Sequence, residues 1–246
     1  MGNAQGTPGR VLWLAHSLFT IRIVKEKRGR GSKRLGVVFF LACVLQGAFW
    51  PGQRASAADA KVIVFFGDSL TAGYGIELSQ AFPALIQEKI AARGWNFSVV
   101  NAGTSGETTA AGLRRIDWVL KTKVNVFVLE LGGNDGLRGI APAVTERNLQ
   151  AIIDKTKTKF PRARVVIVGM QAPPNMGEPY AREFRQIFVD LSKRNHAALI
   201  PFLLEGVAGV AELNQGDGIH PTPEGHKIVA ENVWKALQPV LRSLGP

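Results

Sequence analysis

Residues 62–70 read VIVFFGDSL and join a short apolar run to a polar turn. An unbroken run of Val, Ile and Phe that ends at a glycine is typical of a strand buried on both faces. Similar short apolar runs follow along the chain, at residues 98–100, 124–131, 164–169 and 198–200. Because antiparallel strands usually alternate between apolar and polar residues, these runs favour a parallel sheet with both faces covered.

Longer amphipathic segments separate these runs, with apolar residues spaced three and four apart as on one face of a helix. We expect helices at residues 81–93, 108–121, 142–159, 178–195 and 223–241. The last helix has Thr222 as a plausible N-cap and Pro223 at its first position. Alternating strands and helices predict an α/β domain of three layers, α/β/α, with a flavodoxin-like parallel sheet of about five strands.

Polar motifs follow the predicted strands, where open α/β sheets bind their ligands. Gly67-Asp68-Ser69 follows the first strand, residues 101–106 (NAGTSG) the second and residues 132–135 (GGND) the third. Residues 217–220 (DGIH) lie in the loop before the last helix. The fold would gather these motifs along one edge of the sheet.

The first and last motifs supply the groups of a serine nucleophile. A serine hydroxyl becomes nucleophilic when an imidazole takes its proton, and a carboxylate fixes the tautomer of that imidazole. We therefore expect Ser69 as the nucleophile, His220 as the base and Asp217 as its orienting acid. Four histidines are present, and only His220 has an acid three residues before it in a predicted loop; the others are His16, His196 and His226.

Each of these assignments has a structural alternative. Ser69 could simply cap a tight turn, since Gly-Asp-Ser is common turn chemistry. His226 could be the base, or His220 could merely cap the last helix. Ser105 is a second candidate nucleophile, which we interpret as loop structure because it lies among Gly and Thr residues.

Hydrogen-bond donors for a developing oxyanion are also available at the strand ends. Asn134 follows two glycines, so the backbone can approach a ligand and the side-chain amide can donate into the site. The backbone N–H groups of Ser69 and Gly106 complete a predicted oxyanion hole of three donors. Taken alone, residues 132–135 would indicate an ordinary turn.

The order and spacing of these four motifs resemble the four sequence blocks of the SGNH, or GDSL, hydrolase family across residues 61–242. The resemblance implies the same roles for Ser69, His220 and Asp217, with Gly106 and Asn134 in the oxyanion hole. Residues 66–74, 130–139 and 174–177 are most similar to the exported bacterial branch of thioesterases, arylesterases and lysophospholipases. Pro173-Pro174-Asn175 departs from some members and leaves the preferred acyl length open.

We therefore expect a serine esterase or thioesterase that hydrolyses small-molecule acyl esters, among them aryl esters, acyl thioesters and lysophospholipids, through an acyl-enzyme. An acyl groove could be lined by Leu137, Ile140, Met176 and Tyr180, although these residues could equally pack against helices. Alternatives are a short-chain acetylesterase acting on acetylated carbohydrate and a noncatalytic binding domain on the same fold.

Two other enzyme classes fit less well. An aspartyl phosphotransferase with Mg²⁺ could use Asp68, Asp135 and Asp217, but Leu70 stands where its second acid is expected. A lipase of the nucleophile-elbow type needs Gly-x-Ser-x-Gly, which the chain lacks. We expect no metal and no organic cofactor.

The charge is concentrated in the first 57 residues. The chain carries a formal charge of +11, but residues 1–57 hold nine Lys/Arg and one acid, which leaves 21 basic and 18 acidic residues for the rest. Since no stripe of Lys and Arg interleaved with aromatics remains, we expect no nucleic-acid partner.

The same segment resembles an export signal. Six Lys and Arg residues at 25–34 precede an apolar stretch at 35–50, and Ala55-Ser56-Ala57 fits a small-x-small cleavage pattern. We expect a leader at 1–57, a hydrolase domain at 58–246, and a periplasmic or secreted enzyme without stable membrane insertion. A retained membrane anchor is the alternative, but sixteen residues fall short of the ~20 that span a bilayer. Translation could also start near Val24, and the oligomeric state stays open.

Overall fold

The computed structural model of the chain describes residues 60–245. Five parallel strands form one sheet in the order β2-β1-β3-β4-β5. The strands are β1 (Lys61–Gly67), β2 (Phe97–Gly103), β3 (Val126–Glu130), β4 (Arg164–Val168) and β5 (Ala198–Ile200). This strand order is that of flavodoxin-like folds, so the predicted three-layer α/β/α class is confirmed.

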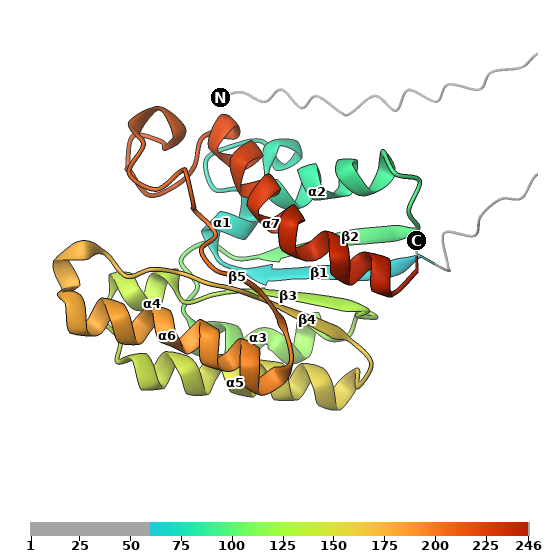
Figure 1. The fold of residues 1–246 in the computed structure, drawn as a ribbon, viewed down its shortest axis with the longest axis horizontal. Coiled ribbons are helices and arrows are strands. Elements are labelled where there is room, and N and C mark those ends of the chain that lie inside the picture. Colours follow the sequence, from blue (N-terminus) through green and yellow to red (C-terminus); the bar gives the residue numbers. More distant parts are fainter. Residues whose placement is uncertain (1–59, 246) are drawn as a thin grey trace, which may run out of the picture. The chain divides into compact units, whose positions relative to one another are not determined.

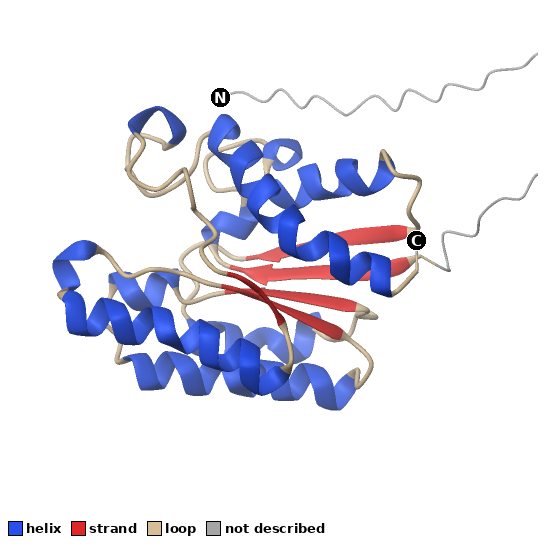
Figure 2. Cartoon of the chain, in the orientation of Figure 1, coloured by secondary structure: helices blue, strands red, loops and turns tan. Residues whose placement is uncertain are grey.

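Helices cover both faces of the sheet (Figure 1). They are α1 (Ser69–Ala72), α2 (Phe82–Ala91), α3 (Thr109–Val119), α4 (Gly133–Leu137), α5 (Pro142–Lys159), α6 (Glu178–Asn195) and α7 (Pro223–Ser243), with 3₁₀ turns η2 (Leu78–Gln80), η3 (Pro174–Met176) and η4 (Ala211–Leu213). Figure 2 shows the strands in red between two layers of helices. One layer holds α1, α2 and α7, and the other holds α3, α4, α5 and α6.

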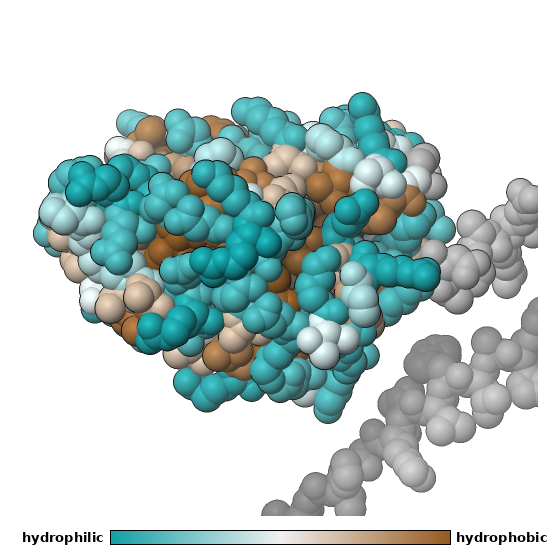
Figure 3. Space-filling model, turned by 60° about the horizontal axis from the view of Figure 1, so that its bottom comes forward, coloured by the Kyte–Doolittle hydropathy of each residue, from teal (hydrophilic) through white to brown (hydrophobic). Residues whose placement is uncertain are grey.

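The double cover explains why the strand sequences lack alternation. Every residue of β3 is buried, and so are the last five residues of β1. On the outside, the face of the molecule in Figure 3 is mainly hydrophilic, with apolar residues visible between the polar ones. Most apolar side chains of the described residues therefore pack inward, as burial of apolar surface favours.

Two differences from the sequence prediction bear on the site. β2 extends to Gly103 and pairs in register with β1 as far as Gly67, so residues 101–103 belong to the strand rather than to a loop. A β-carbon on Gly103 would lie 2.3 Å from the backbone nitrogen of Ala72, so glycine lets this strand end lie against α1. The predicted turn at residues 132–135 instead opens a short helix, α4, after Gly132 at φ 122°.

The strand order places a topological switch point at β1. The chain leaves β1 for β2 on one side and then returns to β3 on the other. Crevices form where successive connections diverge in this way, at the carboxyl ends of the strands. Ser69 follows β1 directly and therefore lies at this crevice.

Among residues 60–245, no helix combines the length and the apolar character needed to cross a membrane. The predicted leader and its cleavage point at Ala57 lie outside the described residues.

Candidate active site

Ser69 is the first residue of helix α1, directly after β1. The Asp68 side chain caps this helix by accepting a hydrogen bond from the Leu70 backbone N–H at 3.0 Å. A β-carbon on Gly67 would lie 2.2 Å from the Thr71 hydroxyl oxygen, so only glycine allows the strand to turn this tightly into the helix. The turn holds the nearly buried Ser69 side chain at the mouth of a cavity.

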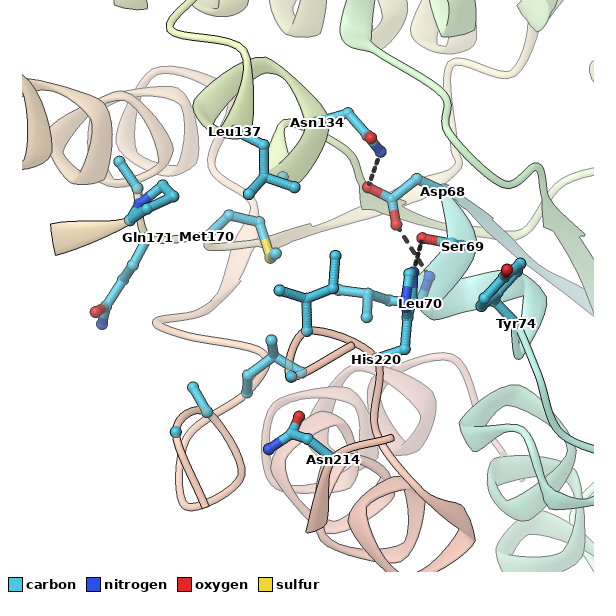
Figure 4. A pocket seen from close by; sticks show the side chains of 18 of the residues that line it. Asp68, Ser69, Leu70, Tyr74, Asn134, Leu137, Met170, Gln171, Asn214 and His220 are labelled. Carbon is cyan, nitrogen blue, oxygen red and sulfur yellow. Dashed lines mark hydrogen bonds between the residues drawn. The ribbon is translucent and has the colours of Figure 1, made fainter. Parts of the chain in front are cut away.

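His220 connects the serine to Asp217, and Figure 4 shows the His220 ring beside Ser69. Its Nε2 lies 2.9 Å from Ser69 Oγ, and its Nδ1 lies 2.6 Å from Asp217 Oδ2. The other carboxylate oxygen of Asp217 accepts from the backbone N–H groups of Ile219 at 3.0 Å and His220 at 3.1 Å. The three-residue spacing therefore folds into a turn that aims the carboxylate at the ring.

The hydrogen bonds to Asp217 also set its charge. The bond from the His220 side chain, followed by the two backbone bonds, lowers the pKa of Asp217 to about 2. Asp217 is therefore ionised over the whole physiological range. An ionised acceptor at Nδ1 places the ring proton there and leaves Nε2 facing the serine hydroxyl as the proton acceptor.

Two of the three predicted oxyanion donors have N–H groups without an acceptor among the described residues. The backbone N–H groups of Ser69 and Gly106 donate to no residue in the described range 60–245. Both residues line the cavity, and Gly106 has φ +76°, a conformation that favours glycine. They are available to a charged oxygen next to Ser69.

Asn134 lies at the same cavity, but its amide is already engaged. Its Nδ2 donates to Asp68 Oδ2 and to the Glu107 carbonyl, each at 3.1 Å. Figure 4 shows the side chain turned toward Asp68. Donation to an oxyanion therefore requires a shared hydrogen bond or a rotation of this amide.

Two buried carboxyl groups lie behind the nucleophile. Burial raises the pKa of Asp68 to about 6, and burial together with the nearby Asp68 raises the pKa of Glu130 well above its usual range. Glu130 Oε2 accepts from the Thr71 hydroxyl at 2.7 Å and from the Asp68 backbone N–H at 3.2 Å. Its Oε1 is buried without a described partner, which also favours the neutral form of this carboxyl group.

The other candidates have structural contacts. His226 is buried in α7, and its Nδ1 accepts from the Phe82 backbone N–H at 3.2 Å. Burial lowers the pKa of His226 to about 4, so this ring is a neutral cap for helix α2. His196 ends α6 in a left-handed conformation. Ser105 lines the cavity, but the histidine contact is made by Ser69.

The cavity beside Ser69 has a volume of about 630 Å³ and a mainly apolar wall. Of the four predicted groove residues, Leu137 lines it, whereas Ile140, Met176 and Tyr180 do not. The Tyr180 hydroxyl donates to the Ile140 carbonyl at 2.8 Å, and its ring stacks on Phe184 at 5.8 Å. That part of the predicted groove is corrected: these three residues are half-buried and lie outside the lining of this cavity.

The sequence analysis pointed to Pro173 and Pro174 as a site of variation in acyl preference, but it missed most of the other residues of the apolar wall. The wall is formed by Leu70, Met170, Ala172, Pro173, Pro174, Phe202, Leu204, Ala208 and Ile219. Apart from Leu70 and Ile219, these residues follow β4 and β5, and both strands had been predicted. Ligands bind at the carboxyl ends of the strands in such sheets, so the position of these residues directly after two predicted strands is the sequence signal that points to them.

Among the described residues, no group of three or more His, Cys, Asp or Glu side chains is arranged to hold a metal ion.

Comparison with known proteins agrees with this geometry. Residues 65–228 match the model of the GDSL-like lipase/acylhydrolase family. The esterase TesA of Pseudomonas aeruginosa is 42% identical over 201 residues, which is 81% of this chain and 99% of TesA. The thioesterase 1/protease 1/lysophospholipase L1 of Escherichia coli K12 is 40% identical over 189 residues, covering 76% of this chain and 88% of that enzyme.

Solved structures show the same fold. A crystal structure of TesA superposes with a TM-score of 0.70 at 41% identity and covers 73% of this chain and 99% of that one. The psychrotrophic esterase EstA from Pseudoalteromonas, in a structure inhibited by monoethylphosphonate, gives a TM-score of 0.70 at 30% identity and covers 74% and 99%.

Proposed function

Since this chain belongs to the GDSL-like lipase/acylhydrolase family and is a hydrolase of ester bonds, we propose that Ser69, His220 and Asp217 are its catalytic triad. The observation that carries this proposal is the hydrogen-bonded series from Ser69 Oγ through both ring nitrogens of His220 to Asp217. It provides a nucleophile, a base and an orienting carboxylate in one line.

The reaction has two acyl-transfer steps. Ser69 Oγ attacks the carbonyl carbon of the substrate while His220 Nε2 takes the hydroxyl proton, and Asp217 stabilises the resulting imidazolium. The tetrahedral intermediate collapses, and the leaving alcohol or thiol takes the proton from His220. Water, deprotonated by His220, then attacks the acyl-serine and releases the carboxylic acid and free Ser69.

The oxyanion of each intermediate has donors available beside Ser69. The free backbone N–H groups of Ser69 and Gly106 line the cavity and support this role. Asn134 is the third donor in this proposal, and it acts after its amide shares or exchanges the hydrogen bonds to Asp68 and Glu107. Donors fixed by the fold stabilise the developing charge without reorganising at the moment of reaction.

The substrates we propose are esters and thioesters with an apolar acyl group, including aryl esters and lysophospholipids. The apolar wall of the cavity supports this choice, because Met170, Phe202 and Leu204 offer contacts to an acyl chain. Relatives named esterase, thioesterase, lysophospholipase and arylesterase support it as well. We further propose that residues 1–57 direct export and are removed.

The proposal is tested with a panel of p-nitrophenyl esters of increasing acyl length, an acyl-CoA and a lysophospholipid. Ser69→Ala should lower kcat by ~10⁴ to 10⁶-fold, as in other serine hydrolases that lose a triad member. Ser105→Ala is the matched control at the same cavity, and kcat should stay within about fivefold because no histidine bonds this hydroxyl.

Two results would contradict the proposal. Turnover of Ser69→Ala at the wild-type rate would remove the serine mechanism. Activity confined to acetyl esters would favour a short-chain acetylesterase and would contradict the assignment of the cavity to longer acyl groups.

A further inference from the structure

The loop that carries His220 is largely exposed, so something must hold it against the nucleophile. Asp217, Gly218 and Ile219 are exposed. In the described part of the chain, two hydrogen bonds join residues 69–76 to residues 214–221: His220 to Ser69, and Gln215 Nε2 to the Tyr74 carbonyl at 2.7 Å. The first bond must break and form again as the proton moves. The second is free to hold the two segments together throughout.

Gln215 bonds to the histidine segment through its backbone as well as its side chain. Its backbone N–H donates to the His220 carbonyl at 2.7 Å, and its Nε2 also donates to the Pro221 carbonyl at 3.0 Å. The side-chain amide therefore uses both hydrogens, one within its own loop and one toward Tyr74. This one residue therefore holds the carbonyl groups of both His220 and Pro221.

Tyr74 completes a closed circuit of hydrogen bonds. Its backbone N–H donates to the Ser69 carbonyl at 3.0 Å, and its own carbonyl accepts from Gln215. The path runs from Ser69 through Tyr74 and Gln215 to His220, and it returns to Ser69 through the catalytic bond. A shift of the histidine loop away from the serine therefore has to break the bond between Gln215 and the Tyr74 carbonyl as well.

Two local features favour this arrangement. A β-carbon on Gly75 would lie 2.1 Å from Gln215 Oε1, so glycine leaves the room that the amide occupies. The Tyr74 ring lies 4.5 Å from the His220 ring, between centroids, at 39° (Figure 4). An aromatic face at this distance stabilises a cation such as the imidazolium. The Gln215 bond to the Tyr74 carbonyl thus also holds this ring in place.

We propose that Gln215 is a positioning residue that keeps His220 within hydrogen-bonding distance of Ser69 during turnover; this inference rests on the proposed triad. Gln215 is not among the residues that line the cavity, whereas its neighbour Asn214 is. Its loss should therefore lower kcat and leave KM nearly unchanged. Misplacement of a catalytic group by about 1 Å can cost on the order of 10²-fold in rate.

The experiment replaces Gln215 in the full chain with Met, which keeps the length but has no donor, and with Glu, which keeps the shape but presents oxygens to the carbonyls. Both variants should lower kcat for a p-nitrophenyl ester by about tenfold or more, with KM within about twofold. Gln186→Met is the matched control, because Gln186 donates to Asp190 on the exposed surface of α6, and it should leave kcat and KM unchanged.

A background variant distinguishes positioning of the base from general stabilisation. In Ser69→Ala the base has no serine proton to accept, so adding Gln215→Met should change the residual rate by less than about twofold. Wild-type kcat in both Gln215 variants would overturn the inference. So would a fold-loss of rate from Gln215→Met that is as large in the Ser69→Ala background as in the wild type. If Gln215→Met does not fold, Gln215→Glu alone decides. Full turnover by Ser69→Ala would instead overturn the proposed triad.

Discussion

Two aspartates at the site have opposite pKa shifts, and the local contacts explain both. Asp217 lies in an exposed loop, yet hydrogen bonds from His220 and two backbone N–H groups lower its pKa to about 2. Asp68 is buried, so its pKa is raised to about 6 although Leu70 and Asn134 donate to it. Hydrogen bonding is thus the main cause of the lowered pKa of Asp217, and desolvation is the main cause of the raised pKa of Asp68. Of the two, only Asp217 stays ionised well below pH 6.

At the same scale, His226 makes the fold sensitive to acid. Burial lowers the pKa of His226 from its ordinary value near 6.5 to about 4, so the unfolded chain binds more protons between these values. The stability contributed by the neutral ring is complete above about pH 6.5 and is lost as the pH falls toward 4. Between pH 7 and pH 5 the loss should be about 2 kcal/mol.

His226→Gln keeps a hydrogen-bond acceptor for the Phe82 backbone N–H but cannot titrate. Urea unfolding at pH 7 and pH 5 should show a smaller loss of free energy on acidification in this variant than in the wild type. Asp68, with its raised pKa, changes stability in the opposite direction over this interval. Because Asp68 is present in both proteins, the difference between them isolates the contribution of His226. Equal pH dependence in both proteins would contradict the assignment.

At the scale of elements, Arg115 on α3 joins the ends of two strands to the loop that carries Gly106. Its guanidinium pairs with Glu107 and donates to the Ala102 carbonyl at 2.8 Å and the Gly67 carbonyl at 3.3 Å. It also lies 4.2 Å from the ring centroid of Phe66. The Glu107 carbonyl accepts from Asn134, so the same loop carries one proposed oxyanion donor and orients another.

Arg115→Met should therefore destabilise the protein. It leaves the buried Glu107 carboxylate and the two carbonyls without this partner, and removing one member of a buried ion pair costs about 3 kcal/mol. Lys155→Met is the matched control, because Lys155 pairs with Asp117 at the surface and should cost less than about 0.5 kcal/mol. Chemical denaturation of both variants measures the difference, and a similar cost for the two would be inconsistent with a structural role for Arg115.

At the scale of the whole molecule, the site and the start of the described chain lie at opposite edges of the sheet. The described residues begin beside Lys61 at the amino end of β1, whereas Ser69 follows its carboxyl end. All five strands, both helix layers and the cavity lie within residues 60–245. The contacts described for the proposed triad are all made by residues within this range.

A chain that starts at Ala58 should therefore fold and hydrolyse esters with a kcat/KM within about twofold of that of the full-length protein, since a compact domain has its own core. Enzyme assays and circular dichroism of the two proteins provide the measurement. Mass spectrometry of the exported protein should find Ala58 as its first residue. A truncated chain that is unfolded or inactive would show that the leader contributes to the domain.

The sequence by itself determined the fold class and the identity of the catalytic candidates. Five apolar runs and the amphipathic segments between them predict the layers, because periodicity is a local property of the chain. Ser69, Asp217 and His220 could be selected from their types and spacing, because the chemistry of acyl transfer restricts the choice. In the structure, His220 is hydrogen-bonded to both Ser69 and Asp217.

The tertiary structure alone decided the contacts between distant segments. The cavity wall includes Phe202 and Leu204 rather than Tyr180, because the tyrosine ring stacks on Phe184 of the same helix, α6. Asn134 is bound to Asp68, and Gln215 reaches Tyr74 across 141 positions in the sequence. No local pattern encodes such pairs, because side-chain direction and burial depend on how the layers pack together.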